Sequence, residues 1–343
     1  MRRAVGTAWL LWLLMAGAAA CPICFRDAAP TVAQQLAVAD RAVVVQVAAD
    51  GAQRVAAVIK GSEDGGPLQV AVAGAGSWLL LRPTPAAEWT VVGAVAAERA
   101  PFLQRVATAA PGDGAADAQW PAYAAALLPY LHDSDALVAG IAYGELARAP
   151  YGAMRTLKPR LDAARCAAGI DDPTRQALFT LLAGISGDAQ TAALIEQRID
   201  TAWRAKDATN LAALLAADLE LRGPARVARI DKMYIADRER TLPEIHAVLH
   251  ALSAHGDADA AIPRERIVRS YRLFIREHKP MAGYVTHDLA AWHRWDAAPE
   301  FLQLLQANAL PDPASRWAVA AYLMQSPRED TKAAVRAIMG SSR

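Results

Sequence analysis

Two patterns of apolar and polar positions divide the chain. Between residues 41 and 97, short apolar runs are separated by turn residues, which is typical of β-strands. Asp50-Gly51, between the first two runs, is a strong signal for a two-residue hairpin turn. We predict strands at 42–47, 55–59, 68–73, 78–81 and 89–95, which suit a five-stranded β-barrel-like domain closed by a helix near 101–108.

Beyond residue 117 the apolar positions follow the helical period instead. One stripe joins Leu178, Leu181 and Ile185, a second joins Val227, Ile230 and Tyr234, and a third joins Ile267, Tyr271 and Phe274. Each helix is apolar on one side only, so neighbouring helix pairs must stack to bury these stripes. The helix pairs are expected near 120–166, 173–205, 208–240, 243–279, 281–309 and 313–340.

Signals for helix starts and ends recur along this region. They are Asp172-Pro173 and Asp312-Pro313, Gly187-Asp188 and Gly256-Asp257, and the prolines Pro224, Pro263 and Pro299. An acidic residue before a proline is favoured chemistry for a helix start. The intervals are close to multiples of 35 to 39 residues, and periods in this range are typical of stacked helix pairs.

Two stretches with this chemistry resemble the first helices of HEAT-type repeats. Residues 172–178 read Asp-Pro-Thr-Arg-Gln-Ala-Leu, and residues 312–318 read Asp-Pro-Ala-Ser-Arg-Trp-Ala. Each has a proline start, a basic residue, and then small and apolar residues. The resemblance implies an all-α, HEAT-like superhelical repeat array (an α-solenoid) that presents an extended surface to another macromolecule.

The first residues have the pattern of an export signal. Arg2 and Arg3 precede an apolar run at 8–15, and small residues occupy 18–20. The apolar run is shorter than the ~20 residues that span a bilayer, so no transmembrane helix is expected. We therefore predict a signal peptide at 1–20 and a periplasmic or secreted protein.

Cleavage after Ala20 leaves Cys21 as the first residue, with Cys24 three positions on. In an oxidising compartment the two cysteines can form a disulfide. Two alternatives are acylation of Cys21, which would make a membrane-anchored lipoprotein, and a metal or redox site. Cys166 has no obvious partner if these two pair, and it reads as a small buried apolar residue.

A chain that begins at Cys21 and continues into a β domain with the line Val58-Ile59-Lys60-Gly61 also resembles the netrin-like fold of the tissue inhibitors of metalloproteinases. In that family, the terminal amine and carbonyl of the first cysteine chelate the zinc of the target. The match stops at Cys21, because the next cysteine of the family comes two residues on and the other cysteines of its disulfide framework are missing here. The resemblance implies an OB- or netrin-like barrel, with protease inhibition as an alternative function.

Composition agrees with two folded domains and gives no sign of a nucleic-acid partner. The 343 residues include 36 Lys and Arg against 35 Asp and Glu, for a formal charge of +1, and 54% are apolar. The predicted α+β organisation is a signal peptide at 1–20, the β domain at 21–110, a Gly- and Asp-containing linker at 111–117, and the helical array at 118–343.

The strongest polar constellation is Glu244 with His246 and His250. The two histidines are four positions apart, so on a helix they share one face and could bind one metal ion, with zinc as the candidate. The order differs from His-Glu-x-x-His, and the sequence marks no third ligand. Structural or solvated histidines are the alternative interpretation.

A second cluster contains Trp292, Arg294 and Trp295. Tryptophan and arginine often anchor protein interfaces, so an exposed patch of these residues would be a candidate docking site. The alternative is that Leu289 and Trp292 pack between helices. No catalytic motif is recognisable, so we expect an exported, non-enzymatic module that binds a protein partner and needs no cofactor. The competing hypotheses are a metal-dependent enzyme using His246 and His250, and an inhibitor or redox module acting through Cys21 and Cys24.

Overall fold

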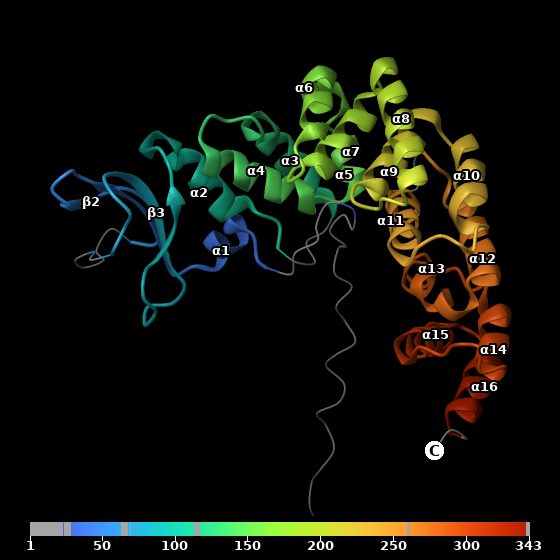
Figure 1. The fold of residues 1–343 in the computed structure, drawn as a ribbon. Helices are drawn as coiled ribbons and strands as arrows, with labels where there is room; N and C mark the ends of the chain where they lie inside the picture. Colours follow the sequence, from blue (N-terminus) through green and yellow to red (C-terminus); the bar gives the residue numbers. More distant parts are fainter. Residues whose placement is uncertain are drawn as a thin grey trace, which may run out of the picture. The chain divides into compact units, whose positions relative to one another are not determined.

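The structure is a computed structural model that describes residues 23, 29–62, 68, 70–112, 117–258 and 261–340. The signal peptide expected at 1–20, both Cys21 and Cys24, and most of the linker expected at 111–117 lie outside these residues. The chain forms two compact units, Met1–Leu157 and Lys158–Arg343. Its fold is α+β, with a small antiparallel sheet in the first unit and helices through the rest (Figure 1).

The first unit contains the strands and the first five α-helices. They are α1 (Val32–Val38), β1 (Arg41–Val47), β2 (Gln53–Lys60), β3 (Gly76–Arg82), β4 (Thr90–Ala94), α2 (Ala100–Ala109), α3 (Trp120–Leu127), α4 (Ala136–Arg148) and α5 (Tyr151–Arg155), with 3₁₀ turns at Ala97–Arg99, Asp117–Gln119 and Leu128–Tyr130.

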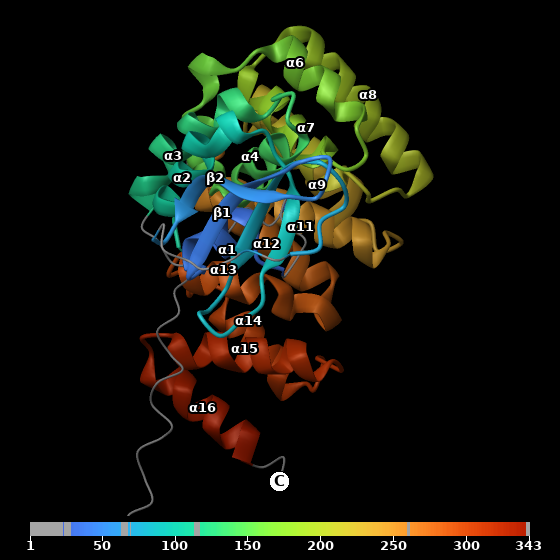
Figure 2. The same ribbon diagram turned by 90° about the vertical axis from the view of Figure 1, so that its left-hand side faces the viewer.

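The sheet has the strand order β2-β1-β3-β4, and all neighbours are antiparallel (Figure 2). The hairpin predicted at Asp50-Gly51 joins β1 to β2, and Gly51 adopts the positive φ of 85° that such a turn requires. Val43, Val45 and Val47 of the inner strand β1 form a core cluster on one face of the sheet with Leu80 of β3.

The prediction of a five-stranded barrel was wrong, since the described residues contain four strands in an unclosed sheet with β2 and β4 as its edges. The expected strand at 68–73 does not join the sheet. Leu68, Val70 and Val72 instead pack their side chains on the sheet core, and Gln53 donates a hydrogen bond to the Val70 carbonyl (2.7 Å). The alternation of apolar residues in this segment thus marks the side that packs on the sheet, and not a strand hydrogen-bonded into it.

The second unit contains the remaining helices. They are α6 (Ala163–Ala168), α7 (Gln176–Ser186), α8 (Ala189–Ala205), α9 (Leu211–Arg222), α10 (Ala225–Ile230), α11 (Leu242–Ala258), α12 (Arg264–Glu277), α13 (Thr286–Ala291), α14 (Ala298–Gln306), α15 (Pro313–Gln325) and α16 (Glu329–Gly340). A π-helix, η6 (Asp231–Ile235), continues α10, and 3₁₀ turns occur at Lys158–Arg160, Gly169–Asp171 and Lys279–Val285 (η7).

Most of the predicted helix signals are confirmed. Asp312 accepts hydrogen bonds from two backbone N–H groups at the start of α15, and Asp188 caps α8 just after α7 ends at Gly187. Two signals act differently. The Asp172 carboxylate bonds to Thr174 in a turn that delays the start of α7 until Gln176, and Gly256 lies inside α11 instead of ending it.

In the second unit, the main packing contacts join elements that are close in chain order. Helix α7 packs on α9, α9 on α11, and η7 and α13 on α15, while α8, α10, α12, α14 and α16 lie along the other side (Figure 1). The predicted apolar stripes are buried, as Leu181, Tyr271 and Phe274 illustrate. Across the described residues, no helix has the length and apolarity needed to cross a membrane.

Candidate functional site

The two predicted metal-binding histidines lie on one face of α11. Their rings are nearly parallel, at 24°, with centroids 6.4 Å apart, and the His246 ring also packs edge-on against Tyr284 (4.8 Å). His250 is exposed and His246 is half-buried. The structure therefore brings the two imidazoles together, at the surface of the second unit.

The third member of that constellation has a different role. Glu244 is fully buried and forms a capping box with Thr241, whose backbone N–H (3.0 Å) and hydroxyl (2.9 Å) both donate to its carboxylate. The other carboxylate oxygen pairs with Arg240 at 3.1 Å. The Glu244 carboxylate thus caps the start of α11 and pairs with Arg240. Among the described residues, no group of three or more His, Cys, Asp or Glu side chains is arranged to bind a metal ion.

The Arg240 guanidinium in turn lies over two aromatic rings, 4.7 Å from the ring centroid of Trp203 and 5.7 Å from that of Tyr234. It also donates to the Trp203 carbonyl (3.1 Å) in the preceding helix pair. The Thr241-x-x-Glu244 spacing is a recognisable capping signal that could have been used to predict this role from the sequence.

The predicted interface residues do not form one exposed patch. Trp292 is 7% exposed, stacks on Tyr271 (5.6 Å, 11°) and donates its indole N–H to Asp257 (2.7 Å). Trp295 is half-buried against Tyr322 (5.0 Å), and Arg294 forms an ion pair with Glu265. Trp292 therefore packs between helices, as the alternative interpretation of the sequence predicts.

The polar groups around Trp292 are coupled to one another. Tyr271 is fully buried and donates its hydroxyl to Asp288 (2.5 Å), and desolvation followed by the Asp288 charge raises the pKa of this phenol. Desolvation, aided by the charge of Asp288, also raises the pKa of the Asp257 carboxyl, although the hydrogen bond from the Trp292 indole works in the opposite direction. These groups hold α11, α12 and α13 together.

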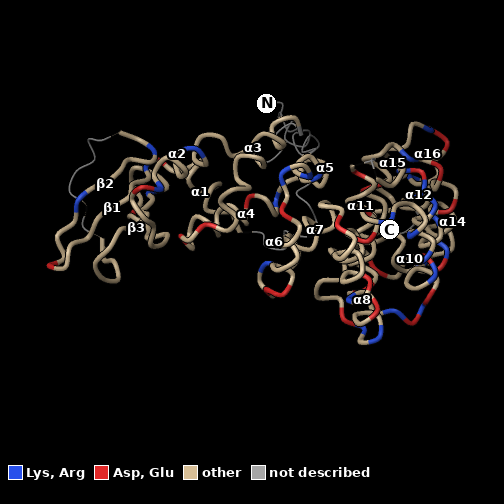
Figure 3. Tube along the Cα trace, turned by 90° about the horizontal axis from the view of Figure 1, so that it is seen from above, with Lys and Arg blue, Asp and Glu red and all other residues tan. Residues whose placement is uncertain are grey.

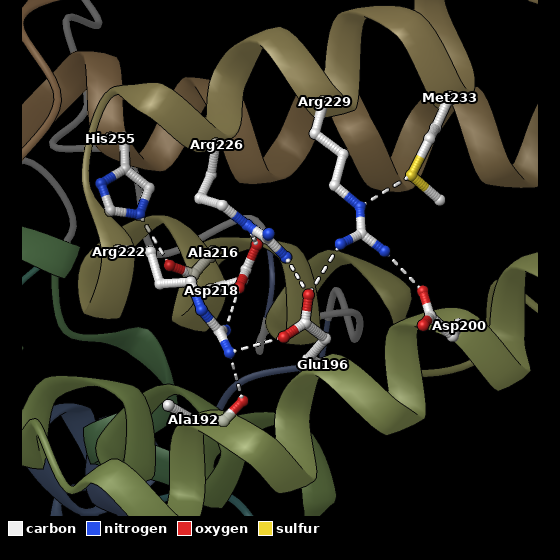
Figure 4. Close-up of polar contacts among 10 residues, drawn as sticks. All are labelled: Ala192, Glu196, Asp200, Ala216, Asp218, Arg222, Arg226, Arg229, Met233 and His255. Carbon is white, nitrogen blue, oxygen red and sulfur yellow. Dashed lines mark hydrogen bonds and ion pairs between the residues drawn. The ribbon is translucent and has the colours of Figure 1, made fainter.

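A larger ionic network connects α8, α9 and α10 (Figure 4). Glu196 accepts from three guanidinium groups, those of Arg222 (2.8 Å), Arg226 (3.1 Å) and Arg229 (2.7 Å). Asp218 pairs with two of these arginines, Arg222 (2.5 Å) and Arg226 (2.7 Å), and Asp200 pairs with Arg229 (2.6 Å). Three cations thus balance three anions.

Partial burial works against ionisation of Glu196, but hydrogen bonds and charges from Arg226, Arg222 and Arg229 outweigh it and hold its pKa below the ordinary value. Along the rest of the second unit, positive and negative residues are also interspersed (Figure 3). Arg272, for example, pairs with Glu300 at 2.5 Å, and Arg266 with Asp231 at 2.6 Å. These arginines therefore bind carboxylates of neighbouring helices.

Buried polar contacts around the π-helix are not predictable from the sequence pattern. The Tyr234 hydroxyl is buried with no hydrogen-bond partner among the described residues, and desolvation, followed by the nearby charge of Glu244, raises its pKa. His278 contacts the Ile235 carbonyl (2.8 Å), and buried His255 contacts the Ala216 carbonyl (2.8 Å). These histidines link successive helix pairs, a role that only tertiary structure reveals.

The exposed large apolar side chains of the second unit occur on a few elements. They are Leu242 on α11, Tyr284 on η7, and Trp317 and Met324 on α15. The element that carries Tyr284, η7, packs on α15. The Tyr284 ring also touches the His246 ring of α11. We call Leu242, His246 and Tyr284 the aromatic ridge, and it is the candidate functional surface.

Comparison with known proteins identifies no relative. No family model matches the chain, and neither curated proteins nor solved structures give a significant match.

Proposed function

We propose that this chain is an exported, non-enzymatic protein-binding module whose second unit is a HEAT-like α-solenoid. The observation that carries the proposal is the spacing of polar contacts between helices. Arg240 reaches the Trp203 carbonyl 37 residues away, His255 reaches Ala216 at 39, and Trp292 reaches Asp257 at 35. Separations of about one repeat are what an array of nearest-neighbour contacts produces.

The first unit provides a contrast. There, the Thr31 hydroxyl donates to Glu145 across 114 residues, as in an ordinary compact domain. Long-range closure of this kind differs from the one-repeat spacing in the second unit. One-repeat separations also occur in the first unit, as in the hydrogen bond that the Ala96 N–H donates to Asp135 across 39 residues, so the contrast rests on the Thr31–Glu145 contact alone.

The aromatic ridge supports protein binding as the role of the array. Large aromatic side chains such as Tyr284 make good interface anchors, because they bury much area at little entropic cost. Several arginines of the second helices are instead paired with carboxylates, as Arg226 is with Glu196. A surface with balanced charge and exposed aromatic side chains fits a polypeptide better than a polyanion.

Export belongs to the same proposal and is supported by the sequence of residues 1–20. An N-terminal fusion test checks it. Residues 1–20 joined to a reporter that is active only outside the cytoplasm should give a signal, and replacing Leu11 and Leu14 by charged residues should abolish it. A fusion whose reporter stays inactive in the cytoplasm would contradict export. It would not affect the proposal that the second unit is a helical repeat array.

Binding is tested by site-specific photo-crosslinking in living cells. A photoreactive residue placed at Leu242 or at Tyr284 should give crosslinked products of the same mass, because both positions belong to the aromatic ridge. The matched control is Ala228, which is exposed on α10 at the opposite layer of helices. Equal products from all three positions, or none from either ridge position, would contradict the proposed binding surface.

A further inference from the structure

The two imidazoles of α11 are arranged as a pair that solvent can reach. The rings of His246 and His250 lie on one face of the helix, with centroids 6.4 Å apart and planes inclined by 24°. His250 is exposed and His246 is half-buried. Residues four apart on a helix lie one above the other, so the helix itself holds the two rings together.

Other histidines of the second unit show what a structural histidine does in this fold. His255 is fully buried and places Nε2 2.8 Å from the Ala216 carbonyl, and buried His278 makes the same kind of contact with the Ile235 carbonyl (2.8 Å). The printed contacts of His246 are instead ring contacts, with His250 and edge-on with Tyr284. Ring packing does not use the nitrogen lone pair through which a neutral imidazole binds a metal ion.

Helix α11 carries no cation that would repel a metal ion at this pair. Between Leu242 and Ala258 it contains no Lys or Arg, and its charged residues are Glu244 and Asp257. The Glu244 carboxylate is buried in its capping box and paired with Arg240, so it is not a ligand. The protein ligands are therefore two imidazoles, and water fills the other coordination positions.

The spacing of the rings is compatible with a shared ion. With metal–nitrogen bonds of about 2.0–2.1 Å, one ion can join two imidazoles whose centroids are up to roughly 6.5 Å apart. The observed 6.4 Å lies at the far end of that range. Binding must therefore bring the rings closer, and rotation of the exposed His250 side chain does this without moving the helix.

We propose that His246 and His250 bind one divalent transition-metal ion, Cu²⁺ more tightly than Ni²⁺ or Zn²⁺. Imidazole suits all three ions, and the affinity of a given nitrogen site is highest for Cu²⁺, which also accepts a tetragonal set of nitrogen and oxygen ligands. Structural and catalytic zinc sites use four or three protein ligands. A site with two is open to solvent, so its ion is exchangeable.

This inference goes beyond the proposed function, because it needs neither the repeat array nor a protein partner. The test is a Cu²⁺ titration of the purified protein by calorimetry, in a background carrying Cys21→Ser and Cys24→Ser so that these thiols do not compete. We expect saturation at one ion for each chain. Electron paramagnetic resonance of this complex should show coupling to two imidazole nitrogens. Binding should weaken in acid, because protonation removes the lone pair that each imidazole donates.

The diagnostic variant is His250→Ala, since His250 is exposed and its loss leaves the packing of His246 on Tyr284 in place. We expect the dissociation constant for Cu²⁺ to rise at least about tenfold, because the loss of even an outer-shell partner typically weakens metal sites by about 10–100-fold. His246→Ala should act in the same direction. His287→Ala is the matched control, because His287 is exposed on α13, and it should leave the constant unchanged.

Circular dichroism melting shows whether each variant is folded, and His250→Ala is informative even if His246→Ala disturbs the contact with Tyr284. A wild-type protein without saturable binding overturns the proposal. An affinity that His250→Ala leaves unchanged also overturns it, since the ion would then be bound elsewhere. So does a spectrum with coupling to one nitrogen only. Crosslinking at Leu242 or Tyr284 can fail while the ion binds, or the reverse, so this proposal and the proposed function fail separately.

Discussion

The indole of Trp292 lies directly against Gly256, so closely that a Cβ atom at position 256 would be 2.2 Å from the ring. The two residues belong to α13's C-terminal end and to α11, and the Trp292 N–H is bonded to Asp257, the next residue along. A glycine inside a helix normally costs stability relative to alanine. Here the missing side chain is what allows the neighbouring helix to approach.

Gly256→Ala should therefore destabilise the protein, whereas the same change at an open helical position should stabilise it. We expect a loss of about 1–3 kcal/mol, because the rigid, buried indole must move. Gly140 is the matched control: it lies in α4 with no atom within 4 Å of the added methyl group, so Gly140→Ala should gain about 0.5–1 kcal/mol. Urea unfolding measures both, and a stabilised Gly256→Ala would show that Trp292 does not pack there.

These two glycines also show how far the sequence can predict the fold. The sequence predicts a helix end at Gly256, because this glycine follows an apolar helix and precedes an aspartate, just as Gly187 does. Only Gly187 has the positive φ, 83°, of a helix terminus. Local composition is the same at both sites, so the difference depends on Trp292, which is 36 residues away in the sequence.

The buried ion pair of the first unit gives a second prediction. Glu145 is fully buried and pairs with Arg148 (2.9 Å), and Tyr123 donates to the same carboxylate (3.2 Å). Glu145→Leu leaves the guanidinium buried without its counter-charge and should cost about 3–5 kcal/mol. The double variant Glu145→Leu/Arg148→Met should recover much of this loss, since neither charge is then left alone.

Thermal unfolding of the two single variants and the double variant tests this coupling. An additive result, with the double variant as unstable as the sum of the single variants, would show that the pair is not coupled. Arg328→Ala serves as the surface control, because the Arg328–Asp330 pair is exposed on both sides, and it should leave the melting temperature unchanged.

The ionic network in Figure 4 predicts how stability depends on pH. The pKa of Glu196 is lower in the folded protein than its ordinary value of 4.5, so the folded state binds this proton less readily than the unfolded state does. The stabilisation is therefore complete above the ordinary pKa and is lost as the pH falls through the folded pKa.

Glu196→Gln removes this contribution, so the variant should be less stable than the wild type at neutral pH, and the difference should shrink as the solution becomes more acidic than pH 4.5. Urea unfolding midpoints at several pH values measure it. Glu98→Gln, at an exposed position of the first unit, is the control and should follow the wild-type curve. A gap between Glu196→Gln and wild type that stays constant with pH would contradict the role given to the network.

Residue pairing at the candidate sites was predictable only where it is local. His246 and His250 share a face because four residues make about one helical turn, and the structure places them so. Glu244 could not be assigned from its proximity to His246, since its partners are Thr241 before it and Arg240, which is held by Trp203 of the preceding pair. The sequence contains the capping signal but not the neighbouring helix that buries it.

Cys166 provides the last prediction, on thiol reactivity. Desolvation, followed by the charge of Asp162, raises the pKa of this buried thiol to about 11 from an ordinary 9.0. The reactive thiolate should then be about 100-fold scarcer in the folded protein, and burial slows its reaction further. Alkylation with iodoacetamide at mildly alkaline pH, followed by mass spectrometry of the Cys166 peptide, should show slow modification of the native protein and fast modification in urea.

Asp162→Asn keeps the capping acceptor of α6 while removing the charge, so it should speed native labelling only modestly. Equal rates in native and unfolded protein would mean that Cys166 is accessible and that α6 does not bury it.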